Sequence, residues 1–124
     1  MTNPPVVVHD PKKGEIWKVR FKPSIGAEIK KTRRAVVVND DKIGNLRLRI
    51  VVPVTGWNER YKNIVWQVYL AKNRQNNLDK TSSADTSQVK SISVDRFVEK
   101  VGSITSREMD EILAGIALCI GYNP

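Results

Sequence analysis

The sequence contains one cysteine and one histidine among 124 residues. The single Cys119 excludes a disulfide within one chain, and one cysteine with one histidine cannot supply the usual ligands of a zinc site. The lone His9 also excludes a Ser-His-Asp triad and a pair of catalytic histidines. We expect His9 to lie in solvent and Cys119 to be a small core residue. Any catalysis must therefore use Arg, Lys, Asp, Glu, Ser or Thr, and no metal or other cofactor is expected.

Long apolar runs and phosphate-binding glycine loops are also missing. No stretch of about 18 apolar residues is present, so no membrane-spanning segment and no membrane partner are expected. No charged region followed by an apolar run opens the chain, so the sequence predicts a cytoplasmic protein. Neither GxxxxGK[ST] nor GxGxxG occurs, which excludes nucleotide binding of those two kinds.

Acidic residues are few relative to basic ones, and the imbalance is uneven along the chain. The formal net charge is +8 at pH 7; residues 1–34 carry +6, residues 35–80 carry +4 and residues 81–124 carry −2. A positive field on the first two thirds favours association with a polyanion such as nucleic acid. A basic surface without a partner remains the alternative at this point.

The apolar pattern predicts one mostly β domain over residues 13–124, preceded by a flexible proline-containing tail over residues 1–12. Thr105 and Glu108 fit a capping box, and the apolar residues that follow recur at helical spacing until Gly121. Strands followed by one closing helix predict a small, mostly antiparallel barrel or sheet with a helix packed at its end. The expected strands cover residues 14–21, 35–38, 46–54, 64–70, 86–92 and 98–101, and residues 22–32 and 71–84 are expected to be loops.

Three places carry residues suited to phosphate or base recognition. Arg33 stands where a polar loop meets a buried strand, so its guanidinium can bind a phosphate from a rigid support. Thr55 ends an apolar strand, Gly56 permits close approach of a ligand, and Trp57 has a ring that can stack on a base. The segment Ser82–Lys90 combines hydroxyls, a carboxylate and an amide. Each also has an ordinary explanation, as a strand-edge cation, as turn chemistry or as a solvated loop.

The order and spacing of these places resemble the MazF/PemK family of toxin endoribonucleases. The similarity runs from about Lys12 to Tyr122. The segments that carry it are Lys13-Gly14-Glu15-Ile16-Trp17, Gly26-Ala27-Glu28 followed by Arg33, the strand ending in Asn39-Asp40-Asp41, Val52-Pro53-Val54-Thr55, Ser87-Gln88-Val89-Lys90-Ser91-Ile92, and Val101-Gly102-Ser103-Ile104-Thr105 before the final helix.

The resemblance implies a small SH3-like barrel of the CcdB/PemK type with a C-terminal helix, acting as a homodimer. It implies a toxin of a type II toxin–antitoxin system, an RNA interferase that cleaves single-stranded mRNA at specific sequences without a metal. The products would carry a 2′,3′-cyclic phosphate and a 5′-hydroxyl. The catalytic residues would be Arg33 and Thr55, and the partner would be an antitoxin whose acidic, flexible segment covers the site.

We further predict supporting and RNA-binding roles for residues in and around these segments. Supporting roles fall to Glu28, Asp85, Ser87 and Gln88, and RNA-binding roles to Lys30, Lys31, Arg34, Trp57 and Lys90. The chain departs from the family pattern where Arg34 replaces proline, where Ser87 replaces an acid and where Gly56 replaces a second hydroxyl.

Two other readings stay open. A noncatalytic toxin that resembles CcdB and binds DNA gyrase would use the same barrel but would give Arg33 and Thr55 no role. An inactive basic RNA-binding module would use the charge without chemistry. Only an RNA-cleaving enzyme turns over substrate, and only a gyrase binder captures a topoisomerase.

Overall fold

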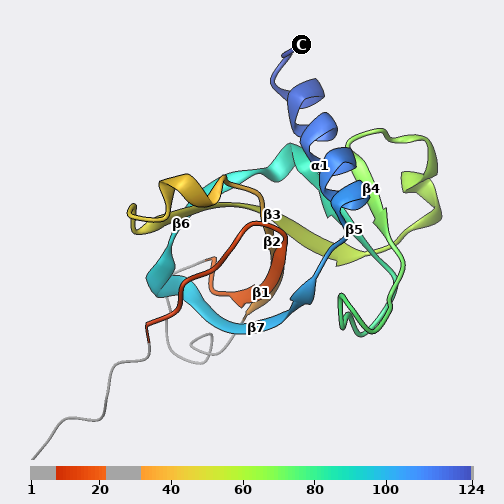
Figure 1. The fold of residues 1–124 in the computed structure, drawn as a ribbon. Helices are drawn as coiled ribbons and strands as arrows, with labels where there is room; N and C mark the ends of the chain where they lie inside the picture. The colour runs from red at the N-terminus through yellow and green to blue at the C-terminus, as the bar shows by residue number, and fades with distance from the viewer. Residues whose placement is uncertain (1–7, 22–31, 124) are drawn as a thin grey trace, which may run out of the picture.

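Seven strands and one α-helix make up the computed structural model, which describes residues 8–21 and 32–123 (Figure 1). The predicted mostly β fold with a C-terminal helix is confirmed. The elements in chain order are β1 (Glu15–Val19), β2 (Arg33–Val37), the 3₁₀-helix η2 (Asp41–Ile43), β3 (Leu48–Gly56), η3 (Glu59–Asn63), β4 (Gln67–Leu70), β5 (Ser82–Asp85), η4 (Thr86–Gln88), β6 (Lys90–Ser93), η5 (Val94–Arg96), β7 (Phe97–Ser103) and α1 (Ser106–Cys119).

The long strand β3 organises the sheet. The strand order is β4-β5-β3-β2-β1-β7, and β6 pairs with the first half of β3 on the edge that β5 uses for the second half. The short helix η5 leads from β6 directly into β7, so β1, β2, β3, β6 and β7 curve round a common centre (Figure 1). Within the described residues β6 and β7 do not pair, so the barrel is partly open.

The central strands are buried on both faces, as the apolar run 35–38 predicts. Ala35 and Val37 face one apolar cluster inside the barrel, together with Trp17 and Phe97. Val36 faces a second cluster on the opposite side of the sheet, which includes Ile112 of α1. Because neighbouring residues of a strand project to opposite faces, the continuous run of valines supplies both clusters at once.

The final helix begins at the capping box that the sequence predicts. Thr105 Oγ1 accepts the amide N–H of Glu108 at 3.1 Å, and the Glu108 carboxylate accepts the amide N–H of Thr105 at 2.9 Å. Ile112 of this helix is fully buried, and the helix packs against β4 and η4. Gly121 has φ of +73°, a conformation that glycine adopts without strain. Over residues 8–21 and 32–123, no helix is long and apolar enough to cross a membrane.

Several local expectations are corrected. Thr86–Gln88 forms a 3₁₀-helix instead of a strand, because the Asp85 carboxylate caps it by accepting the amide N–H of Ser87. Ser82–Asp85, most of which was expected to be loop, forms the fully buried strand β5. The strand expected from residue 64 begins only at Gln67. Cys119 is exposed and is not a core residue.

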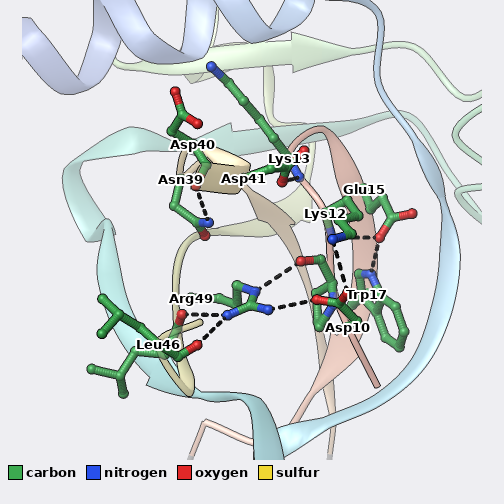
Figure 2. A network of polar contacts seen from close by, with 12 residues as sticks. Asp10, Lys12, Lys13, Glu15, Trp17, Asn39, Asp40, Asp41, Leu46 and Arg49 are labelled. Carbon is green, nitrogen blue, oxygen red and sulfur yellow. Dashed lines mark hydrogen bonds and ion pairs between the residues drawn. The ribbon is translucent and has the colours of Figure 1, made fainter. Parts of the chain in front are cut away.

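Residues of the predicted tail contact the barrel: Pro11 is buried, and Asp10 pairs with Arg49 of β3 (Figure 2). Arg49 is 3% exposed at its side chain, and its guanidinium donates to the carbonyls of Pro11, Leu46 and Leu48 and to the Asp10 carboxylate. Four hydrogen bonds compensate the burial of this cation, and the two to Pro11 and Asp10 tie the incoming segment to β3. His9, expected to lie in solvent, packs edge-on against Trp17 with ring centroids 5.0 Å apart.

The motif Lys13–Trp17 has a structural explanation in the same network (Figure 2). Gly14 has φ of +88°, which favours glycine. One Glu15 carboxylate oxygen accepts the Lys12 amide N–H and the Trp17 indole N–H, and the other pairs with Lys100 at 2.8 Å. Burial raises the pKa of Glu15, but the Lys100 ammonium and the two N–H donors outweigh it, so that pKa lies below its ordinary value of 4.5.

Candidate active site

A pocket of about 240 Å³ is lined by the start of β2, the end of β3 and the segment that leads into β5. It brings together the predicted residues Arg33, Arg34, Thr55 and Gly56. The other lining residues are Thr32, Val54, Leu78, Asp79, Lys80 and Ser82. Among the described residues three cations and one carboxylate line it, so this part of the lining is net positive and suits an anionic ligand.

Arg33 at the start of β2 and Thr55 near the end of β3 both line this pocket. Ala35 pairs with Pro53 and Val37 with Val51, which sets the alignment of the antiparallel strands β2 and β3. Arg33 is exposed and Thr55 is half-buried. An exposed guanidinium and a half-buried hydroxyl therefore meet at the pocket.

Arg34 is engaged within the protein. It follows Arg33 on β2 and projects to the opposite face. Its Nη2 atom donates to the carboxylate of Asp79 at 2.6 Å, and its Nε atom is buried with no hydrogen-bond partner among the described residues. The RNA-binding role expected for Arg34 therefore competes with an ion pair that the folded chain already makes.

The segment that carries Asp79 and Lys80 is built around Asn76, which is fully buried. Asn76 Oδ1 accepts the amide N–H groups of Asn73 and Leu78, while Asn76 Nδ2 donates to the carbonyl of Ala71 at 2.7 Å. Asparagine side chains that replace backbone partners in this way fix tight turns. No role was predicted for Asp79 or Lys80, for which the run of asparagines before an acid–base pair was the signal available, whereas Ser82 opens the predicted segment Ser82–Lys90.

The predicted supporting residues Asp85, Ser87 and Gln88 do not line the pocket. Asp85 lies at the end of β5 away from Ser82, and its carboxylate accepts Ser87 Oγ–H at 2.6 Å and Gln88 Nε2–H at 2.8 Å. These three side chains satisfy one another around the cap of η4. The bonds of Asp85 are therefore structural in this conformation.

Two predicted RNA-binding residues lie outside the pocket lining. The Trp57 ring packs edge-on against Tyr61 and Tyr69, with centroids 5.8 and 4.9 Å apart, and its indole N–H donates to Glu59 at 3.1 Å. Trp57 directly follows Gly56, so this aromatic cluster borders the pocket. The Lys90 ammonium lies 4.8 Å from the centroid of the Phe21 ring. The remaining predicted residues Glu28, Lys30 and Lys31 lie outside the described residues.

No part of the described chain gathers three His, Cys, Asp or Glu side chains in a position to share a metal ion. The groups that the described lining offers to a ligand are guanidinium, ammonium and hydroxyl groups, because its carboxylate, Asp79, is already bonded to Arg34. These groups can hold a phosphate and offset negative charge that develops on it.

Comparison with known proteins agrees with this geometry. Residues 12–120 match the family described as PemK-like, MazF-like toxin of type II toxin–antitoxin system. The chain belongs to this family. The toxin of a type II toxin–antitoxin system predicted from the sequence is thereby confirmed. A curated relative, endoribonuclease MazF9 of Mycobacterium tuberculosis, is 30% identical over 107 residues, which cover 82% of this chain and 88% of the relative.

Solved structures share the fold of this MazF-like toxin. A MazE–MazF structure from Deinococcus radiodurans has a TM-score of 0.73 at 18% identity and covers 93% of this chain and 100% of that one. An endoribonuclease in complex with its cognate antitoxin from Mycobacterial species has a TM-score of 0.66 at 13% identity, covering 93% and 97%. At these identities the similarity establishes the fold, and the site rests on the residues of this chain.

Proposed function

We propose that this MazF-like toxin is a metal-independent endoribonuclease that cleaves single-stranded mRNA at specific sequences. The reaction takes place in the pocket at the start of β2 and the end of β3. The observation that carries the proposal is that Arg33 and Thr55, which stand at neighbouring ends of the paired strands β2 and β3, both line one cationic pocket. The endoribonuclease name of the curated relative supports the same reaction.

In the proposed reaction the ribose 2′-oxygen attacks the adjacent phosphorus. The 2′-hydroxyl loses its proton, the bond from phosphorus to the 5′-oxygen breaks, and that oxygen gains a proton. The products are a 2′,3′-cyclic phosphate and a 5′-hydroxyl, so the enzyme supplies no covalent nucleophile. Arg33 offsets the charge on the pentacovalent phosphorane, and the Thr55 hydroxyl donates to a non-bridging oxygen. Arg33 is not assigned as the base, because a guanidinium does not give up its proton near neutral pH.

Incubation with a mixed-sequence single-stranded RNA in EDTA tests the proposal. We expect the wild type and Arg107→Ala to cleave the RNA and leave cyclic phosphates, whereas Arg33→Ala leaves the RNA intact. Arg107 is a matched control because its side chain on α1 is 91% exposed and does not line the pocket. Mapping the product ends also yields the sequence preference.

Full activity of a folded Arg33→Ala variant would reject the site. Absence of cleavage by every protein would favour the gyrase-binding toxin or the inactive RNA-binding module. Capture of a topoisomerase separates those two readings.

We further propose that the toxin's partner is an antitoxin with an acidic, flexible segment that covers this pocket. The net positive lining suits such a segment, and the related endoribonuclease was solved with its cognate antitoxin. We also propose a homodimer, since Leu118, Ile120 and Tyr122 expose apolar surface at the C-terminal end. Light scattering measures the dimer, and an acidic antitoxin peptide should inhibit RNA cleavage competitively.

A further inference from the structure

We propose that Lys80 is a second phosphate-binding cation of the pocket, contacting the substrate backbone beside Arg33. The inference rests on the proposed function only in taking the ligand to be a single-stranded nucleic acid. Lys80 lies in a segment that the sequence pattern predicts as an ordinary loop, and the folded chain brings it to the pocket from 47 positions beyond Arg33.

The loop before β5 is held firmly from both sides. The Asn76 side chain makes hydrogen bonds within the loop. On the β7 side, the Gln75 carbonyl accepts the amide N–H of Ser103 at 3.0 Å. Gly102 approaches so closely that a Cβ there would lie 2.5 Å from the carbonyl oxygens of Gln75 and Asn76. These contacts fix the backbone of the loop and therefore the position from which the Lys80 side chain extends.

The ion pair between Arg34 and Asp79 attaches this loop to β2. Asp79 is the residue directly before Lys80, so the attachment fixes the backbone from which the Lys80 side chain departs. Asp79 is the one carboxylate among the described residues of the pocket lining, and it is bonded to Arg34. Asp79 is therefore already neutralised by a cation other than Lys80.

The Lys80 side chain lies over Gly56. The Cε and Nζ atoms of Lys80 are each 3.0 Å from the position that a Cβ at residue 56 would take. The absence of a side chain at Gly56 thus creates the space in which the ammonium group sits, one residue after Thr55. Among the described residues Lys80 makes no ion pair, so its three N–H donors are available to a ligand.

An ammonium group beside a guanidinium suits two neighbouring oxygens of a phosphate backbone. Lysine acts there as a compact point charge, while arginine offers the planar fork. Gly56 stands where the family pattern has a second hydroxyl. In this chain the ligand would therefore meet the Lys80 ammonium in place of that hydroxyl.

The test compares Lys80→Met with Lys42→Met, two variants that lose the same charge. Lys42 is an exposed residue of η2, at the opposite end of the β2–β3 hairpin, and it does not line the pocket. The probe is a mixed-sequence RNA oligonucleotide with 2′-fluoro riboses, which lacks the attacking hydroxyl. Binding is measured by fluorescence anisotropy over a series of salt concentrations, after circular dichroism has shown that each variant is folded.

We expect Lys80→Met to weaken binding about three- to tenfold relative to Lys42→Met. The slope of log affinity against log salt should fall by about 0.7, the value for one lost phosphate contact with a single strand. Gly56→Ala should displace the Lys80 side chain and weaken binding in the wild type, but it should have little further effect in Lys80→Met.

Equal affinity and equal salt slope for Lys80→Met and Lys42→Met would overturn the inference. This result is distinct from failure of the proposed reaction, because the fluorinated probe reports binding whether or not unmodified RNA is cleaved. Loss of cleavage in Arg33→Ala with unchanged binding in Lys80→Met would keep the enzyme and remove Lys80 from its site. Weakened binding in Lys80→Met without cleavage by the wild type would keep the contact and remove the reaction.

Discussion

The guanidinium of Arg34 donates to the carboxylate of Asp79 at 2.6 Å, although 45 positions separate the two residues in the chain. The contact joins the first residues of β2 to the loop before β5, and the pocket lies between these two segments. Arg34 is half-buried, with 30% of its side chain exposed, whereas 77% of the Asp79 side chain is exposed. The two residues are therefore not equivalent in what their loss would cost.

Removal of Asp79 should destabilise the fold more than removal of Arg34. Asp79→Ala leaves the Arg34 guanidinium unpaired in a confined site and should lower the free energy of unfolding by about 1–2 kcal/mol. Arg34→Met leaves only a solvated carboxylate and should cost less than about 1 kcal/mol. Urea denaturation of both variants measures the difference. The interpretation fails if Arg34→Met is the more destabilising of the two.

Thr55 should contribute to cleavage through its hydroxyl alone. Thr55→Val keeps the β-branched shape at the end of β3 but removes the donor, so we expect the cleavage rate to fall about 100-fold or more. Thr55→Ser keeps the hydroxyl and should retain most of the rate. Single-turnover cleavage of RNA by the two variants is the measurement. Comparable rates for valine and serine would exclude a role for the hydroxyl.

Arg49 should be a major determinant of stability. Its buried guanidinium makes four hydrogen bonds, three of them to backbone carbonyls. Arg49→Ala leaves those carbonyls without this donor and should lower the free energy of unfolding by about 3–5 kcal/mol. Arg49→Lys cannot reproduce the planar fork and should still cost about 1–3 kcal/mol.

Asp10→Ala provides the matched control for Arg49. The Asp10 side chain is 59% exposed, so its loss should lower the free energy of unfolding far less than the loss of Arg49 does. Thermal and urea denaturation check all three variants. A small effect of Arg49→Ala would mean that the N-terminal segment is not held through this residue.

Glu15 should make the stability of the fold depend on pH in the acidic range. Its pKa in the folded protein lies below the ordinary value of 4.5, because the bonds from Lys100, Lys12 and Trp17 outweigh the cost of burial. A group with a lowered pKa stabilises the fold above its unfolded-state pKa and loses that contribution as the pH falls through the folded-state pKa.

Glu15→Gln keeps a side chain of the same shape without the charge. The wild type should therefore be the more stable protein at pH 7, and the difference should shrink as the pH falls below 4.5. Urea denaturation across this range measures the difference between the two proteins. A difference that does not vary with pH would show that the carboxylate does not titrate as described.

Local sequence patterns were sufficient for much of the fold. The capping box at Thr105 and the continuous valines of β2 depend on neighbours within a few residues, which is why periodicity and capping chemistry predict them. The pairing of Arg33 with Thr55 could be proposed through the family motifs, since both residues stand at strand ends. The strand predicted over Thr86–Gln88 was wrong because one side chain, Asp85, caps a turn there.

The composition and order of the residues determine that this chain is a basic, mostly β protein with a closing helix, because charge and apolar periodicity are properties of the sequence itself. Tertiary structure decides what surrounds Arg33. The ion pair of Arg34 with Asp79 and the approach of Lys80 to Gly56 depend on a loop that returns across the sheet. Such contacts join residues distant in the chain, and no local propensity encodes which ones will meet.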